Sequence, residues 1–159
     1  GSLRARRGAV QPVELVFARP EPEAAAHAWA ITGALLREFQ RETVARGAGL
    51  VVVAAAAPAQ VYDDLWTELE GRAAREKLPL SRDHPEERLG SLCREAGIPL
   101  LALGPAFRDA APHHDSTRRE ERLYYEGRFH WNDAGNALAA ASVHDFLGNL
   151  GGSGRTMAP

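Results

Sequence analysis

The sequence predicts a layered α/β fold built around a short, mainly parallel β-sheet. The first indication is the run Leu50–Ala55, which is continuously apolar and rich in β-branched residues. Central parallel strands have this composition when helices cover both of their faces. The second indication is a shorter run of the same kind, Ile98–Leu103. The third is the alternation of these runs with segments of helical periodicity, which is typical of α/β layer architectures.

The first half of the chain is expected to contain a leader, an edge strand and a long helix before the buried strand. Residues 1–11 are basic and irregular, and Gly1-Ser2 resembles the remnant of a cleaved tag. Val13–Ala18 alternates apolar and polar residues and predicts an edge strand. Residues 24–45 predict an amphipathic helix with one packed side. The positions that recur every three or four residues there are Trp29, Thr32, Leu36, Phe39 and Thr43.

The second half is expected to contain three helices, a short strand and a long loop. Residues 61–75 predict the first of these helices. Pro85, followed by two acidic residues, predicts a second helix that ends at Gly97. Residues 104–128 form a loop of unusual length for a compact domain, which makes it a candidate functional segment. The last helix is expected at residues 133–148.

Length and composition indicate a single domain at residues 12–149, followed by a flexible tail at 150–159. Nineteen basic and 21 acidic residues give a net charge of −2, which offers no signature of nucleic-acid binding. No apolar run reaches the ~20 residues that span a bilayer, so membrane insertion is not expected. The single cysteine, Cys93, excludes an internal disulfide and is predicted to be a buried apolar side chain. No signal peptide is visible, and the compartment stays open.

The most informative segment surrounds His130, which lies at the end of the long loop and just before the last predicted helix. A histidine in this position is fixed by a rigid element and reachable from solvent, as a general base must be. The alternative is that His130 caps the helix or packs against Trp131.

The run His-Trp-Asn-x-x-Gly at 130–135 resembles the last conserved block of the SGNH (GDSL-type) hydrolases, a family of serine esterases and O-acyltransferases. In that family a histidine precedes the C-terminal helix. The likeness extends in the family's order over roughly residues 20–149. It rests on four further stretches, which are Trp29–Leu36, Gly49–Pro58, Arg88–Cys93 and Ala96–Phe107.

The resemblance implies a three-layer α/β/α, flavodoxin-like fold with a parallel sheet, of which this chain carries an incomplete, C-terminal part. It also implies that His130 is the base that takes a proton from a nucleophilic serine and returns it to the leaving group. The substrate would be an acyl ester or an acylated carbohydrate, and no cofactor would be needed.

The chain departs from the family at the nucleophile and at the orienting acid. The family's serine lies in a Gly-Asp-Ser block, and neither this block nor the two oxyanion blocks occur here. We therefore expect no ester hydrolysis by this chain alone, which either begins partway through a domain or is a shortened relative. The family's aspartate lies two or three residues before the histidine, where Arg128 and Gly127 stand here. Glu126 is the nearest candidate for that role.

Aromatic and polar side chains around His130 are the candidates for substrate binding. The candidates are Tyr124, Tyr125, Trp131 and Asn132. The aromatic cluster of Tyr124, Tyr125, Phe129 and Trp131 is interpreted either as a stacking wall for an acyl or sugar group or as packing of the loop over the edge of the sheet. A second hypothesis is a catalytically inactive SGNH-like module that binds a partner or glycan through residues 124–131.

Two further possibilities follow from the sequence. His113, His114 and Asp115 with His130 could suggest a metal site, but adjacent histidines in an extended loop point apart, and no metal is expected. An incomplete parallel sheet leaves backbone groups unpaired, so chains could associate into a homo-oligomer through an exposed sheet edge.

Overall fold

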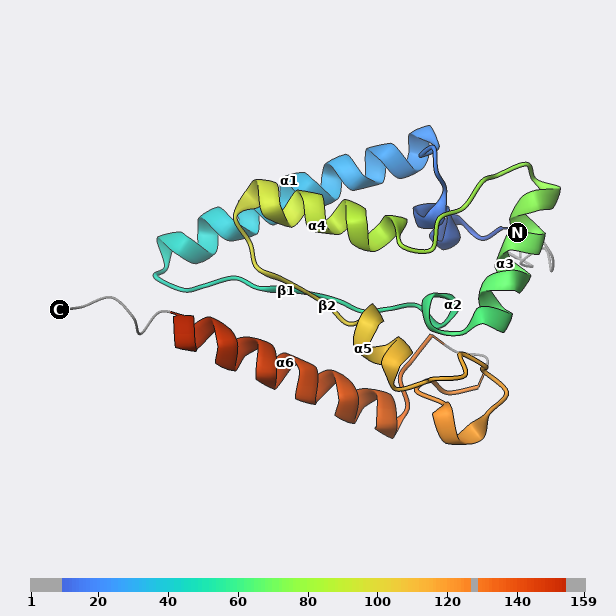
Figure 1. The fold of residues 1–159 in the computed structure, drawn as a ribbon. Helices are drawn as coiled ribbons and strands as arrows, with labels where there is room; N and C mark the ends of the chain where they lie inside the picture. The colour runs from blue at the N-terminus through green and yellow to red at the C-terminus, as the bar shows by residue number, and fades with distance from the viewer. Residues whose placement is uncertain (1–9, 127–128, 154–159) are drawn as a thin grey trace, which may run out of the picture.

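The computed structural model describes residues 10–126 and 129–153. It is 62% helix and only 7% strand, with a two-stranded parallel sheet. The predicted three-layer, flavodoxin-like fold is therefore wrong. Long helices do lie on either side of the two strands, with α1 (Glu23–Ala45) and α4 (His84–Ala96) on one side and α6 (Asp133–Ser153) on the other (Figure 1). Two strands of three residues do not form the sheet on which such a fold is built.

The two strands arise from the two apolar runs that the sequence analysis identified. β1 (Val52–Ala54) pairs in parallel with β2 (Leu100–Ala102), so that Val53 lies opposite Leu101. The backbone N–H of Val52 donates to Pro99 at 2.9 Å, and Ala54 accepts from the N–H of Leu103 at 3.0 Å. Each run was expected to be about twice as long, and only its middle residues are paired.

The predicted strand at Val13–Ala18 is a 3-10 helix instead, η1 (Pro12–Phe17). Its proline occupies the first turn, where a missing N–H has no consequence. The carboxylate of Glu14 accepts from the N–H of Gln11 at 2.7 Å, and the N–H of Glu14 donates back to the carbonyl of Gln11 at 2.8 Å. These local bonds decide the conformation of a segment whose alternating pattern is too short to specify a strand.

Helices α1 and α4 begin and end close to their predicted limits. Gly97 ends α4 in the left-handed conformation at φ 67°, which favours glycine. The two helices pack against each other where Leu92 reaches Gly33, since a Cβ at Gly33 would lie 2.9 Å from the Leu92 side chain. Phe39 was expected on the packed stripe of α1, but it is 58% exposed.

The remaining predicted elements are subdivided. The helix expected at 61–75 is broken at Tyr62 into α2 (Pro58–Val61) and α3 (Asp63–Arg75). The long loop contains a short helix, α5 (Gly104–Asp109), and a 3-10 turn, η2 (Arg119–Glu121).

Helix α6 runs beyond its predicted end. It continues to Ser153, through the first part of the segment expected to be a flexible tail, and residues 154–159 lie outside the described range. None of the helices in the described ranges combines the length and apolar character needed to cross a bilayer.

The main core lies beyond the carboxyl ends of both strands. It includes Phe107, Leu103 and Val61, which are fully buried, and the half of α6 that begins at Asp133 packs against it through Ala139. A smaller cluster joins Phe17 to Trp66 and Leu69 of α3. Cys93 is buried as predicted, and burial raises the pKa of its thiol. The larger of the two core clusters among the described residues thus lies at the carboxyl end of the sheet.

Candidate functional site

The segment around His130 folds into a short antiparallel ribbon. Tyr124 and Trp131 form an isolated β-bridge, and the backbone N–H of Tyr125 donates to the carbonyl of His130 at 3.0 Å. The N–H of Asn132 donates to the carbonyl of Leu123, also at 3.0 Å. These contacts hold the backbone of His130 beside Tyr125, immediately before the first turn of α6.

Tyr124 attaches this ribbon to the carboxyl end of β1. Its hydroxyl donates to the backbone carbonyl of Ala56 at 2.8 Å, two residues past the strand. The rings of Tyr124 and Trp131 also pack against Phe107, with centroids 5.9 and 5.3 Å apart. Burial raises the pKa of the Tyr124 hydroxyl well above its usual value, so this hydroxyl stays neutral.

Asn132 and Gly135 hold the ribbon against the start of α6. The side-chain oxygen of Asn132 accepts from the N–H of Gly135 at 2.9 Å, which satisfies one of the free donors of the first helical turn. Its side-chain amide donates to the carbonyl of Arg122 at 2.7 Å. Gly135 lies against the backbone of Leu123, where a Cβ would come within 2.2 Å of the carbonyl oxygen. Most of the His-Trp-Asn-x-x-Gly run therefore has a structural role.

His130 is the member of this run that packing does not explain. Its side chain is exposed, and no hydrogen bond or ion pair joins its ring to another residue in the described part of the chain. Glu126, the predicted orienting acid, instead pairs with Arg122 at 3.0 Å and has a side chain that is 80% exposed. The His130 backbone is thus held in place, while its ring has no carboxylate partner among the residues that the structure describes.

The four residues predicted to bind substrate occupy different environments. Tyr124 is 5% exposed, and its hydroxyl donates to the backbone carbonyl of Ala56. Asn132 caps α6, and Trp131 is half-buried against the core. Tyr125 is 51% exposed, which leaves it as the member of the set with a free ring face.

Two hollows lie beside the ribbon, on either side of Pro58 and Leu65. The first, of about 200 Å³, is bounded by Tyr125 and Glu126 of the ribbon. The second, of about 330 Å³, is bounded by Phe129, the residue before His130. The other residues around the first are Tyr62, Ser116, Thr117, Arg122 and Tyr124, and around the second Glu14, Ala59, Glu68, Leu69 and Arg72.

Pro58 and Leu65 are not among the site residues that the sequence predicted. Pro58 follows β1 by four residues, and ligands of open α/β sheets bind beyond the carboxyl ends of the strands. That rule, applied to the loop after Leu50–Ala55, is the signal that could have found them.

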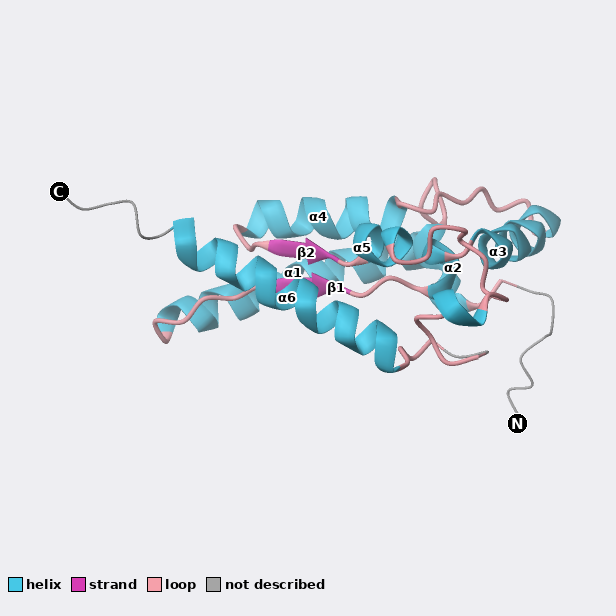
Figure 2. Cartoon of the chain, turned by 60° about the horizontal axis from the view of Figure 1, so that its bottom comes forward, coloured by secondary structure: helices cyan, strands magenta, loops and turns pink. Residues whose placement is uncertain are grey.

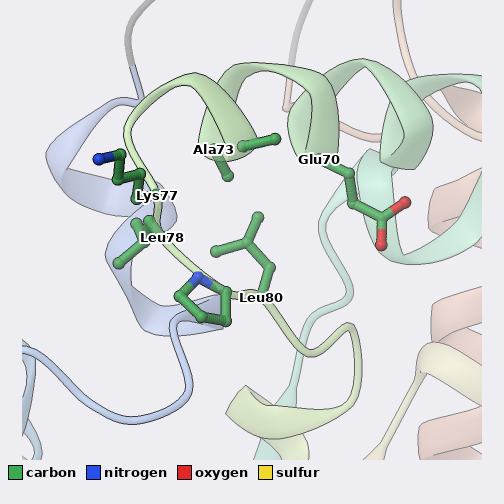
Figure 3. A pocket seen from close by; sticks show the side chains of 7 residues that line it. Glu70, Ala73, Lys77, Leu78 and Leu80 are labelled. Atoms are coloured by element: carbon green, nitrogen blue, oxygen red, sulfur yellow. The ribbon is translucent and has the colours of Figure 1, made fainter.

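A hollow of about 380 Å³ at the end of α3 has no connection to the predicted site residues (Figure 3). Ala73, Leu78 and Leu80 form its apolar wall, and Glu70 and Lys77 lie at opposite sides. It offers one carboxylate and one ammonium without a nucleophile or a histidine, so it does not extend the candidate site.

The other histidines of the long loop have carboxylate partners. His113 pairs with the buried carboxylate of Glu121, and His114 lies 3.6 Å from Asp63. A hydrogen bond from Arg82 holds the pKa of Asp63 below its usual value. Within the described ranges no group of three or more potential metal ligands comes together. Adjacent His113 and His114 thus contact different carboxylates.

Comparison of the chain with protein-family models, with curated proteins and with solved structures finds no match.

Proposed function

We propose that this chain carries the histidine part of a serine-ester hydrolase or O-acyltransferase site of the SGNH type, with His130 as the general base. The observation that supports this most directly is the contrast within one short run of residues. Trp131, Asn132 and Gly135 each have a structural role, whereas the exposed His130 ring forms no hydrogen bond or ion pair with the described residues. An exposed ring on a fixed backbone is what a general base requires.

The position of the ribbon supports the same proposal. The hydroxyl of Tyr124 ties it to the backbone just beyond β1, so His130 belongs to the carboxyl end of the strands. In this role the imidazole removes the proton from a serine hydroxyl as the oxygen attacks the acyl carbon. It then returns that proton to the departing alcohol.

The nucleophilic serine comes from outside the arrangement described. The sequence has no Gly-Asp-Ser block, and the hydroxyls of Ser91, Ser116 and Ser142 already donate to neighbouring oxygens. An oxyanion donor contributes roughly 3–4 kcal/mol to catalysis, and none of the family's donor blocks occurs here. Residues 1–159 alone should therefore not turn over esters at an enzymatic rate.

The substrate we propose is an acyl ester, including an ester on a carbohydrate. The hollow beside Phe129 has an apolar side, formed by Pro58, Ala59 and Leu65, which suits an acyl chain. The hollow beside Tyr125 combines that ring with Ser116 and Thr117, which suits the hydroxyls of a sugar.

The test compares residues 1–159 with the complete product of the gene that encodes them. We expect a serine-directed fluorophosphonate to label the complete product at a Gly-Asp-Ser serine and to leave residues 1–159 unlabelled. In the complete product, His130→Ala should lower the turnover of a chromogenic short-chain ester by about 10²–10⁴-fold. The matched control is His144→Ala, since that side chain is 88% exposed on α6 and should leave turnover unchanged.

Two results would contradict the proposal. One is fluorophosphonate labelling of residues 1–159 at any serine. The other is turnover that is equally insensitive to His130→Ala and His144→Ala. Binding of a glycan by residues 124–131, without turnover or labelling of either protein, would favour an inactive binding module instead.

We also propose that chains associate through an exposed edge of the two-stranded sheet. Edge strands present unpaired N–H and C=O groups that form a template for another strand. Both strands have an edge of this kind in the part of the chain that the structure describes.

A further inference from the structure

The hydrogen-bond pattern of the sheet shows which backbone groups of β1 are free. Val52 donates to Pro99, and Ala54 accepts from Leu103, so both residues turn their backbone groups towards β2. Successive residues of a parallel strand bond to opposite sides. The N–H and C=O of Val53 therefore point away from β2, where no bond to the described residues is formed. Its side chain is also 40% exposed.

The edge of β1 lacks the features that protect strand edges from association. Natural edges are shielded by charged side chains, prolines or bulges. Residues 47–62 contain no charged residue, and their only proline is Pro58, four residues past the strand. β2 lies in a similarly uncharged stretch, residues 96–107, but its three residues are all partly buried, whereas Val53 in the middle of β1 is exposed. The β1 edge is therefore the one of the two that can accept another strand.

An apolar stripe of α1 lies on the same side of the molecule. Ile31, Leu35 and Phe39 are spaced by four residues and so share one side of the helix. They are 49%, 51% and 58% exposed. Gly33, which contacts α4, is two residues from Leu35 and thus about 200° around the helix. Figure 2 shows α4 on the β2 side of the strands and α1 and α6 extending past β1 on the other side.

We infer that the β1 edge and the α1 stripe form a self-association surface whose occupant is a second copy of this chain. An uncharged strand can lie antiparallel to its own copy without repulsion between like charges, and a two-fold axis at Val53 makes the pairing symmetric. The two Val53 residues then exchange both backbone bonds, and residues 51 and 55 pair across the axis. This rests on the proposed association through a sheet edge and is independent of His130.

The exposed area indicates a weak dimer. If a large side chain offers about 200 Å² of surface, the exposed fractions of the three stripe residues leave about 300 Å² of apolar surface per chain. A standard interface buries ~800 Å² per partner, and reversible encounters bury less. We therefore expect dissociation in the micromolar range.

Analytical ultracentrifugation of residues 1–159 from low micromolar to submillimolar concentration tests the inference. The wild type should shift from monomer to dimer. Phe39→Lys should raise the dissociation constant at least about tenfold, since it places a charge in the interface. Val44→Lys is the matched control, because Val44 is 59% exposed on the same helix but outside the stripe, and its dissociation constant should not change. Val53→Pro removes the edge N–H without breaking a bond to β2 and should also weaken the dimer.

Hydrogen exchange measured by NMR on the wild type gives a second readout that needs no substitution. The Val53 amide should become protected as concentration rises, whereas the amides of Val52 and Ala54, already bonded to β2, should not change. A monomer at submillimolar concentration would overturn both this inference and the proposed association. A dimer that is insensitive to Phe39→Lys, with a Val53 amide that is equally exposed at all concentrations, would overturn this inference alone.

Discussion

Replacing Gly135 by alanine should destabilise the fold, because this glycine lies where α6 meets the backbone of the His130 ribbon. The added Cβ would lie 2.2 Å from the carbonyl oxygen of Leu123 and 3.0 Å from the Cβ of Trp131. Carbon–oxygen contacts in proteins are ordinarily ~3.3 Å or longer, so about 1 Å of movement is needed. Neither neighbour can give way by rotating a side chain, since one is backbone and the other is the base of a packed residue.

The magnitude follows from two opposing effects. Overpacking of this kind costs about 1–3 kcal/mol, and the rigid neighbours favour the upper end of that range. Alanine in a helix recovers up to about 1 kcal/mol relative to glycine. The net loss is about 2 kcal/mol, which lowers the Tm of a domain of this size by roughly 6 °C.

Gly148→Ala in the same helix is the matched control. None of the described residues lies within 4 Å of a Cβ at Gly148, so only the gain in helix propensity remains. It should raise the stability by about 0.5–1 kcal/mol. Thermal and urea unfolding followed by circular dichroism measure both variants. A Gly135→Ala protein as stable as the wild type, or equal losses in both variants, would refute the close contact between α6 and the ribbon.

Two further predictions concern buried polar groups. Tyr62→Phe should lower the free energy of unfolding in urea by about 2 kcal/mol, because the buried hydroxyl donates to the carbonyl of Glu121 and accepts from the N–H of Leu123. The control is Tyr125→Phe, which should change this free energy by less than about 0.5 kcal/mol because Tyr125 is 51% exposed. Burial raises the pKa of Glu86 despite a hydrogen bond from Gly104, so the folded state holds this proton more tightly than the unfolded state and loses stability as pH rises through the raised pKa. Glu86→Gln should therefore stabilise the protein at neutral pH but not in acid. The control Glu87→Gln, on a side chain that is 57% exposed, should show no such pH-dependent gain. Equal urea midpoints for the wild type and Glu86→Gln at neutral pH would contradict this prediction.

The elements that the sequence predicted well are those with strong local signals at both ends. Helix α4 has a proline and acidic residues in its first turn and Gly97 in the left-handed conformation at its end. The apolar runs around β1 and β2 are recognisable because nothing polar interrupts them. Such signals depend on neighbouring residues alone, so they survive without knowledge of the tertiary contacts.

The predicted number of strands, and with it the fold class, depended on whether Val13–Ala18 forms a strand, which its short alternating pattern does not decide. The segment Val13–Ala18 alternates for only six residues, and Pro12 with the bond between Gln11 and Glu14 turns it into a helical turn. Without this strand the sheet has two members, and the layered architecture expected from three is lost.

The sequence predicted where His130 lies along the chain, but not which residues its neighbours contact. His130 lies before the last helix, as its sequence context indicated. Which of the surrounding aromatic rings are free depends on burial: Tyr124 and Tyr125 are adjacent, yet one is 5% and the other 51% exposed. Glu126 pairs with Arg122, four residues earlier, and not with His130, four residues later. The spacing in the sequence is the same for both partners, so it could not tell them apart.

Packing differs sharply between the two ends of the sheet, and this separates the two proposals. The main core surrounds the carboxyl ends of the strands and includes Ala139 in the first half of α6. Towards the other end, where α1 and α6 finish on opposite sides of the strands (Figure 1), Phe39 and Leu147 are 58% and 48% exposed. A general base needs the rigid end, because its geometry must be fixed before substrate arrives. An association surface needs unsatisfied apolar and backbone groups, which a well-packed core does not leave. Changes at His130 and at Phe39 should therefore act independently, and coupling between them in a double variant would show that association and catalysis share one site.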